Sequence, residues 1–180
     1  MGHCKTILFV LLITASISTN IAFAEIQRFI SVSPSIMRGS QPENQEDYQL
    51  LVSHGVHTIL NLRTTEKDID LEKKMADTLQ MGFVSIPMSG FWAPDEDDMT
   101  RAIKTLTNPH LQPVFVHCLH GKDRTGLVIG LYRVLVEGWP RDKAYQEMKE
   151  IGFNPWLMGL YHYFWSHPPE HSAPLILRSE

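Results

Sequence analysis

The hydrophobic positions of this chain follow two different periods. Short apolar runs bounded by glycine, proline or charged residues predict strands over 36–42, 57–63, 83–88 and 113–118. Longer segments with helix-start and helix-stop residues predict helices over 44–55, 68–82, 94–106, 127–136, 140–153 and 155–165. Strands alternate with helices until the last helices cluster, so the pattern predicts a single α/β domain with a central sheet.

The predicted helices differ in how much of their surface is apolar. Residues 127–136 contain a single charged residue, Arg133, so we expect this helix to be buried on most sides. Helix 94–106 has one apolar face, made of Met99, Ala102, Ile103 and Leu106. The last helix is expected to turn four residues inward: Leu157, Leu160, Tyr161 and Phe164.

The first residues have the composition of an export signal. Lys5 precedes the apolar run ILFVLLI, and the sequence AFA ends at Ala24. These features predict cleavage after Ala24 and an exported protein, either periplasmic or secreted. The alternative is an uncleaved membrane anchor, but polar residues from Ser16 onward interrupt the apolar run well short of the roughly 20 residues of a span. We therefore expect no stable membrane insertion after cleavage, and three segments: a signal peptide, a folded domain and a tail, over 1–24, 25–167 and 168–180.

Charge and cysteine content narrow the function. The full chain has a net charge of −4, and loss of Lys5 with the signal makes it −5 (−4 − 1). An acidic protein is poorly suited to bind nucleic acid, so we expect no nucleic-acid partner. Cys4 would leave with the signal, so Cys118 would have no partner for an internal disulfide. A single thiol kept in an oxidising compartment is a candidate for a reactive role.

Cys118 begins the loop that carries the candidate chemistry. Five residues separate it from Arg124, between an apolar strand and an apolar helix. Gly121 permits a tight loop whose amides can point inward around an anion, and the start of the following helix adds free N–H groups. Arg124 can bind two oxygens of one oxyanion, and Thr125 can donate its hydroxyl to the sulfur. The positive charge of Arg124 and the positive end of the helix also favour the thiolate of Cys118, which is a nucleophile for displacement on phosphorus.

The stretch HCLHGKDRTG resembles the signature HCxxGxxRTG of the cysteine-dependent protein tyrosine phosphatases. MRGSQP, ILNLR, IPM and GLYRVLVEGWPRDKAYQEMKEIGF are similar to the small bacterial dual-specificity phosphatases, some of which are exported to the periplasm. The resemblance covers most of residues 35–155 and implies a dual-specificity-phosphatase-like domain with a central, mostly parallel sheet flanked by helices. It implies Cys118 as the nucleophile and Arg124 as the phosphate clamp. The implied phosphate-binding loop is Leu119, His120, Gly121, Lys122, Asp123 and Arg124.

The leaving group needs a proton, and the resemblance implies an aspartate on a neighbouring loop as the donor. The stretch GFWAPDEDDM follows the predicted strand 83–88, and Asp95 is the candidate general acid. WAPD is similar to the Trp-Pro-Asp loop of the larger tyrosine phosphatases, but it has an inserted alanine. Alternatively, Asp95 caps the helix that it precedes, with Asp98 completing a capping box. The proton would then come from Asp97, Asp98, Asp123 or water.

Other polar residues have two interpretations. His117 fixes the loop by hydrogen bonding, as the family's histidine does, or it simply packs. Arg38 and Arg63 could reach the site, although structural ion pairs are the simpler expectation. His120 and Lys122 project from the loop and could tune substrate choice. The remaining histidines lack cysteine or acidic neighbours at ligand spacing, so we expect no metal ion, and we expect no other cofactor.

The loop residues favour displacement on phosphorus, and the resemblance implies a metal-independent phosphatase acting on phosphotyrosine, with some phosphoserine or phosphothreonine activity. The alternative is a phosphoinositide or inositol-phosphate phosphatase, because GKDRTG resembles bacterial phosphatases that accept phosphoinositides. A rhodanese-like sulfur-transfer enzyme would use a similar cysteine loop, but RTG favours phosphate. Intact Cys118 and Arg124 disfavour a pseudophosphatase that only binds its partners. The expected partner is a phosphorylated protein or a phosphoinositide as substrate. The sequence pattern does not indicate whether the protein is a monomer or an oligomer.

Overall fold

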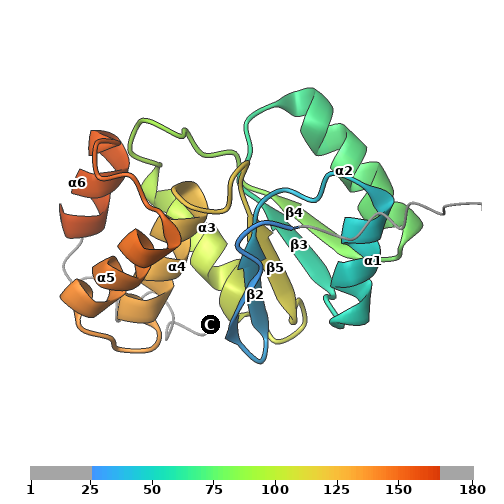
Figure 1. The fold of residues 1–180 in the computed structure, drawn as a ribbon, viewed down its shortest axis with the longest axis horizontal. Coiled ribbons are helices and arrows are strands. Elements are labelled where there is room, and N and C mark those ends of the chain that lie inside the picture. The colour runs from blue at the N-terminus through green and yellow to red at the C-terminus, as the bar shows by residue number, and fades with distance from the viewer. Residues whose placement is uncertain (1–25, 167–180) are drawn as a thin grey trace, which may run out of the picture.

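Strands and helices alternate along residues 26–166, the part of the chain that the computed structural model describes (Figure 1). The strands are β1 (Ile30–Ser33), β2 (Ile36–Gly39), β3 (Thr58–Asn61), β4 (Gly82–Ser85) and β5 (Val114–His117). The helices are α1 (Gln45–Ser53), α2 (Glu66–Thr78), α3 (Glu96–Thr107), α4 (Arg124–Leu135), α5 (Arg141–Ile151) and α6 (Met158–Ser166).

Within these residues the strands form one sheet in the order β1-β2-β5-β3-β4. The four strands from β2 to β4 in that order are parallel neighbours, whereas β1 pairs antiparallel with β2 through Ile30 and Arg38. The predicted α/β domain with a mostly parallel sheet is therefore confirmed. The pattern missed β1, because its four residues are exposed or half-buried and form no apolar run. This strand covers the edge of β2, all four residues of which are buried.

Each face of the sheet has its own apolar core, because successive strand residues point to opposite faces. In β5, Val114 and Val116 belong to the larger core, together with residues of α3, α4, α5 and α6. Phe115 belongs to the smaller core, together with residues of α1 and α2. Figure 1 shows these two sets of helices on opposite sides of the sheet. With both faces covered, ligands have access at the carboxyl edge of the parallel strands.

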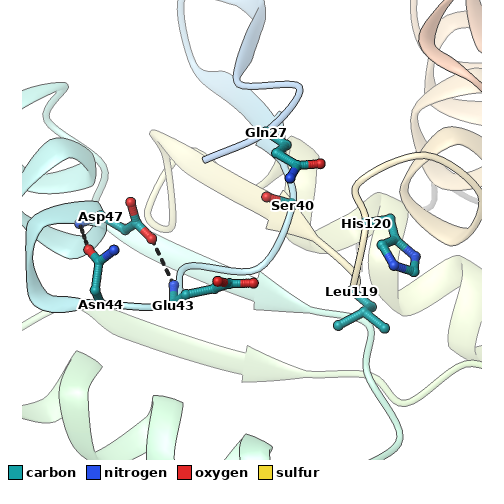
Figure 2. A pocket seen from close by; sticks show the side chains of 7 residues that line it. All are labelled: Gln27, Ser40, Glu43, Asn44, Asp47, Leu119 and His120. Atoms are coloured by element: carbon teal, nitrogen blue, oxygen red, sulfur yellow. Dashed lines mark hydrogen bonds between the residues drawn. The ribbon is translucent and has the colours of Figure 1, made fainter. Parts of the chain in front are cut away.

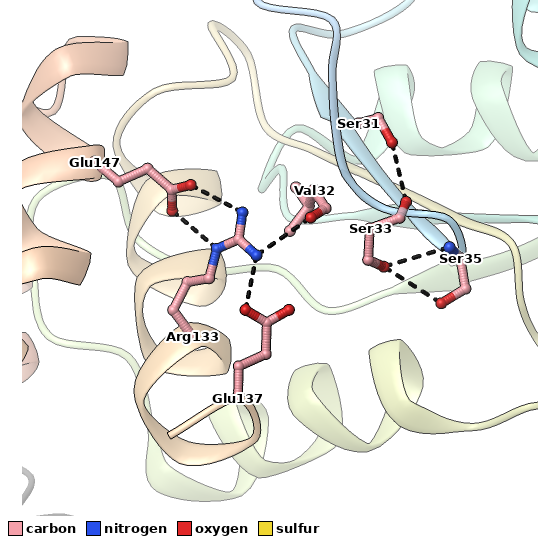
Figure 3. Close-up of polar contacts among 7 residues, drawn as sticks. All are labelled: Ser31, Val32, Ser33, Ser35, Arg133, Glu137 and Glu147. Atoms are coloured by element: carbon pink, nitrogen blue, oxygen red, sulfur yellow. Dashed lines mark hydrogen bonds and ion pairs between the residues drawn. The ribbon is translucent and has the colours of Figure 1, made fainter. Parts of the chain in front are cut away.

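Helix α4 runs through the larger core, and every residue from Thr125 to Val134 is buried, as predicted. Arg133, the charged residue of this run, is paired on both sides of its guanidinium. It makes a two-point contact with Glu147 of α5 at 2.9 and 3.1 Å and pairs with Glu137 at 2.8 Å (Figure 3). The same guanidinium donates to the carbonyl oxygen of Val32 in β1 at 3.2 Å. The network joins α4, α5 and the first hairpin.

The last helix differs from the expected one in its start and in its buried face. It begins at Met158, because Leu157 donates its N–H to the carbonyl of Asn154 in a turn that precedes the helix. Tyr163 is buried, whereas Tyr161 is only partly buried against the core. Leu157 and Tyr161 thus pack against the core at its margin, and Tyr163 is a further buried residue that the expected face did not include.

None of the helices within residues 26–166 is both long and apolar enough to cross a bilayer. The expected signal peptide, 1–24, and the expected tail, 168–180, lie outside the described residues.

Candidate active site

The candidate nucleophile lies where strand β5 ends and helix α4 begins. Cys118 follows the last residue of β5, and Arg124 is the first residue of α4. Because β5 lies between β2 and β3, the loop 118–124 emerges at the middle of the carboxyl edge of the sheet. The Cys118 thiol is buried and free.

The carbonyl groups of this loop point away from its centre. Five consecutive carbonyl oxygens, from Leu119 to Asp123, accept hydrogen bonds from groups outside the loop. Their donors are, in order, the N–H of Gln41, the side chains of Arg28 and Arg38, and the N–H groups of Gly126 and Leu127. The N–H groups of residues 119–124 donate to no oxygen atom of residues 26–166. Apart from the N–H of Gly121, which contacts the Cys118 sulfur, these groups are free donors around the loop, an arrangement that suits a tetrahedral anion.

Gly121 and Arg38 fasten the loop to strand β2. Gly121 has a φ of +68°, and a Cβ atom there would lie 2.3 Å from the backbone carbon and oxygen of Gly39, so only glycine fits. Arg38 is buried, and its Nη2 donates to the Gly121 oxygen at 2.6 Å. Burial lowers the pKa of Arg38 to about 10, which leaves it charged at neutral pH beneath the loop. The expected ion pair forms at Arg63, with Asp68 at 2.7 Å, whereas Arg38 instead donates to a carbonyl.

Several contacts favour the thiolate form of Cys118. Burial by itself would raise the pKa of this thiol, but the pKa is lowered overall. The contacts that outweigh burial are the hydroxyl and the N–H of Thr125, the charge of Arg124 and the N–H of Gly121. The Thr125 hydroxyl is fully buried and has no oxygen or nitrogen partner in the described chain, so its hydrogen is left for the sulfur. A thiolate in this position is a ready nucleophile.

Arg124 is held by carbonyl groups that follow the neighbouring strands. Its Nη1 donates to the oxygens of Leu62 and Met88, at 3.1 and 3.3 Å, just beyond β3 and β4. The backbone of Gly90 lies beside the guanidinium, since a Cβ atom there would be 3.8 Å from Nε. Nε and Nη2 donate to no atom of residues 26–166. One edge of the guanidinium is therefore anchored, and the remaining donors can bind an oxyanion.

His117 is enclosed behind the nucleophile by residues that the sequence pattern did not single out. Its Nδ1 lies 3.0 Å from the Cys118 oxygen, which supports the predicted hydrogen-bonding role. Its Nε2 lies 2.9 Å from Glu72 Oε1, at ion-pair distance although not in hydrogen-bond geometry. Glu72 lies on α2 among charged residues and resembles a solvent-facing residue. The available signal was its spacing of four from Ala76, because residues four apart lie on the same face of a helix. In α2 that face is the buried one, and it contains both residues.

Asp95, the candidate acid, is exposed at the start of α3. Its side chain forms no capping hydrogen bond, and Asp98 pairs with Arg101 at 3.0 Å, so the expected capping box is not formed. Within residues 26–166, no hydrogen bond or ion pair joins Asp95 to the loop 118–124. The structure thus places this carboxylate near solvent, on the segment that contacts Arg124 through Gly90.

The other acidic candidates have different surroundings. Asp97 is exposed on the first turn of α3. Asp123 accepts the backbone N–H of Asn154 at 2.9 Å and lies 4.0 Å from the ammonium of Lys122. The Asp123 carboxylate therefore holds the turn before α6 against the loop. Among the side chains of the loop, His120 is exposed and Lys122 is partly exposed, as expected for residues that project from it.

A pocket of about 280 Å³ opens on the outer side of the loop. It is lined by polar side chains and one leucine: Gln27, Ser40, Glu43, Asn44, Asp47, Leu119 and His120. Figure 2 shows the Glu43 side chain extending toward the loop, while Asp47 accepts the Glu43 N–H at 2.8 Å. The pocket therefore carries two carboxylates, and no lysine or arginine lines it.

Comparisons with known proteins agree with this geometry. Residues 22–154 match the family described as PTP-NADK, DSP-PTPase phosphatase fused to NAD+ kinase. The chain is 30% identical over 122 residues to the dual specificity protein phosphatase TpbA of Pseudomonas aeruginosa strain UCBPP-PA14, which covers 68% of this chain and 53% of that protein. It is 36% identical over 55 residues to the inositol diphosphatase SIW14 of Saccharomyces cerevisiae, 31% of this chain and 19% of that protein. The chain thus spans about half or less of these curated relatives.

Solved structures of the same two relatives share the fold. A crystal structure of a P. aeruginosa TpbA variant in complex with pTyr has a TM-score of 0.73 at 20% identity, and the match covers 90% of this chain and 100% of that one. The core catalytic domain of the PP-IP phosphatase SIW14 from S. cerevisiae has a TM-score of 0.72 at 22% identity, covering 83% of this chain and 91% of that one. These matches confirm the predicted dual-specificity-phosphatase-like architecture.

Proposed function

This chain belongs to the DSP-PTPase phosphatase family, and from that premise we propose that it hydrolyses phosphotyrosine in proteins through a phosphocysteine intermediate, with some activity on phosphoserine or phosphothreonine. The observation that carries the proposal is the loop 118–124, whose N–H groups donate to no oxygen of residues 26–166 and surround a thiol of lowered pKa. A phosphate bound to those groups and to Arg124 would have its phosphorus above the Cys118 sulfur.

The first step transfers the phosphoryl group to the enzyme. An electron pair of the Cys118 sulfur forms the S–P bond while the bond between phosphorus and the leaving oxygen breaks. Asp95 gives its proton to that oxygen, so that tyrosine leaves as a neutral phenol. The segment that carries Asp95 contacts Arg124 through Gly90, which supports its assignment as the acid.

The second step releases phosphate. A water molecule attacks phosphorus, the Asp95 carboxylate takes one of its protons, and the S–P bond breaks to return the Cys118 thiolate. Arg124 and the loop amides neutralise the charge on the non-bridging oxygens in both steps, so neither step needs a metal ion.

Two observations support a phosphoprotein as the substrate. The pocket beside the loop carries the Glu43 and Asp47 carboxylates, which repel a small ring bearing several phosphates. Phe91 and Trp92, on the segment leading to Asp95, are 53% and 69% exposed and offer an aromatic surface to a tyrosine ring.

An inositol phosphate or phosphoinositide is the second candidate substrate. Lys122 projects from the loop, and Arg28 donates to the His120 oxygen at 3.0 Å. The side chains of Lys122 and Arg28 both lie beside Gly152, so two cationic groups stand on one side of the site. The relative SIW14 is an inositol diphosphatase, which supports the same candidate.

A comparison of kcat/KM on a phosphotyrosine peptide, a phosphoserine peptide and a soluble inositol pyrophosphate tests the proposal. We expect the phosphotyrosine peptide to be the best substrate, and a clear preference for the inositol compound would favour the second candidate. Cys118→Ser should abolish turnover and still bind inorganic phosphate, because the amide ring and Arg124 remain. Appreciable hydrolysis by Cys118→Ser would refute the covalent mechanism.

We also propose that the protein acts after export, in the periplasm or outside the cell. The support is the sequence pattern of residues 1–24. Amino-terminal sequencing of the protein recovered outside the cytoplasm should begin at Glu25. Recovery of a chain that retains residues 1–24 would contradict the proposed cleavage.

A further inference from the structure

A buried ion pair lies directly behind the proposed nucleophile. The side chains of His117 and Glu72 are 0% and 3% exposed, and the Nε2–Oε1 distance is 2.9 Å. The other Glu72 oxygen, Oε2, accepts a hydrogen bond from the amide of Asn61, at the end of β3. On its far side the imidazole lies 3.0 Å from the Cys118 backbone oxygen. The contacts form a continuous path from helix α2 to the loop 118–124.

The partners of the imidazole indicate its protonation. A backbone carbonyl oxygen can only accept hydrogen bonds, so Nδ1 must carry a hydrogen to bond the Cys118 oxygen. Nε2 lies at ion-pair distance from a carboxylate oxygen, and that negative charge favours a second hydrogen on the ring. The two contacts together therefore favour the imidazolium form of His117. Consistent with this geometry, the pKa of His117 is raised: burial alone would lower it, but the charge and contact of Glu72, followed by the backbone oxygen and charge of Cys118, outweigh burial.

We propose that Glu72 is a positioning residue for the phosphatase reaction, which keeps His117 as an imidazolium and thereby fixes the Cys118 backbone and favours its thiolate. The proposal rests on the proposed function, because it concerns the same nucleophile. Glu72 touches neither substrate nor sulfur, and it acts only through His117.

Other groups around the pair have separate effects. The groups that face the Cys118 sulfur besides His117 are Thr125, Gly121, Arg124 and Arg38. Phe115 stacks on the imidazole with ring centroids 5.6 Å apart. Tyr48 of α1 faces Glu72, and burial together with that carboxylate raises the pKa of Tyr48. A neutral phenol there leaves Glu72 as the negative charge that opposes His117.

The proposed path makes a prediction whose sign differs from that of a simple charge effect. In Glu72→Gln the fully buried His117 loses its counter-ion and should become neutral, since burial disfavours the charged ring. The thiolate then loses the positive charge of His117, and the Cys118 thiol should titrate at higher pH. If Glu72 acted only as a negative charge near the sulfur, its removal would stabilise the thiolate and shift the titration the other way.

The experiment is the pH dependence of Cys118 alkylation by iodoacetamide, followed by mass spectrometry of the peptide that contains it. We expect the thiol pKa in Glu72→Gln to rise on the order of one unit, which lowers the alkylation rate below that pKa on the order of tenfold. Glu72→Asp keeps the charge on a shorter side chain, so its thiol pKa should lie between those of wild type and Glu72→Gln. Asp77→Asn, in the exposed pair with Lys73 on the same helix, is the control and should match wild type.

Alkylation separates this proposal from the proposed function, because it requires no substrate. A thiol pKa in Glu72→Gln equal to or below that of wild type would overturn the positioning role, even if the enzyme remains an active phosphatase. Conversely, a raised thiol pKa would support the role even if every phosphorylated substrate tested is rejected. A merely structural effect would lower the melting temperature of both Glu72 variants and leave the thiol titration unchanged, which would also overturn it. Because Glu72 acts only through His117, adding Glu72→Gln to His117→Asn should not shift the thiol pKa of Cys118 further.

Discussion

Gly121→Ala perturbs the proposed phosphate loop at its tightest contact. The new Cβ would lie 2.3 Å from the backbone carbon and oxygen of Gly39 and 2.6 Å from the N of Ser40, and backbone atoms cannot rotate aside. A separation of at least 3.0 Å requires the loop to move by about 0.7 Å (3.0 − 2.3). The φ of +68° adds strain for any residue with a Cβ.

The expected loss follows from these contacts. A left-handed alanine costs about 1–2 kcal/mol. Displacement of the Gly121 oxygen weakens its 2.6 Å hydrogen bond from the buried Arg38, which costs about 1.5–3 kcal/mol for a bond to a charged group. The free energy of unfolding should therefore fall by about 2.5–5 kcal/mol. A displacement approaching 1 Å at the reacting centre should also lower kcat/KM by about 10²-fold.

Urea unfolding and kcat/KM on a phosphotyrosine peptide measure the two effects. Gly138→Ala is the matched control, because Gly138 has a φ of +70° and no atom within 4 Å of the added Cβ. It should lose only about 1–2 kcal/mol of stability from backbone strain and keep its activity. Gly55, with a φ of +71° and the same open space, provides a second control. If Gly121→Ala matched these controls in both measurements, the inferred contact with β2 would be refuted.

Three further variants and conditions test other parts of the account. Asp95→Asn should lower the rate by about 10²–10⁴ on phenyl phosphates with poor leaving groups and much less on those with good ones, and an equal, small effect on both would remove Asp95 from the mechanism. Arg124→Lys should reduce kcat/KM strongly, because an ammonium cannot make the planar two-point contact, and near-normal activity would mean that the loop is not a phosphate clamp. The raised pKa of His117 predicts a stabilisation fully present below its unfolded pKa and lost as pH rises through its folded pKa. Urea midpoints from pH 6 to 9 should therefore show the gap between wild type and Glu72→Gln narrowing with pH, whereas a constant gap would contradict the charged pair.

The sequence predicted the local parts of the site, because they are contiguous in the chain. The apolar run before Cys118, the glycine at position 121 and the apolar run after Arg124 specify a strand, a tight loop and a helix without reference to other segments. The order of strands and helices likewise predicted the α/β domain. The first strand, Ile30–Ser33, was not predicted, because it depends on pairing with its neighbour and not on an apolar pattern of its own.

Long-range contacts could not be predicted from pattern alone. Arg38 reaches the loop over a separation of 83 residues, and Glu72 meets His117 from a helix that precedes it by several elements. A charged residue has the same letter whether it faces solvent or a buried partner, so its role depends on the fold. The same limit applies to Asp95. Its expected capping box is not formed, and the segment that carries it contacts Arg124 through Gly90.

Direct observation of phosphorylated Cys118 tests the central claim. The wild-type enzyme is mixed with an excess of phosphotyrosine peptide, denatured within milliseconds and digested with a protease. The mass of the enzyme fragment that contains Cys118 is then measured by mass spectrometry. We predict a phosphoryl group on Cys118 that appears before one turnover is complete and is absent in Cys118→Ser. Turnover without any phosphorylated Cys118, or with the phosphoryl group on another residue, would contradict the account.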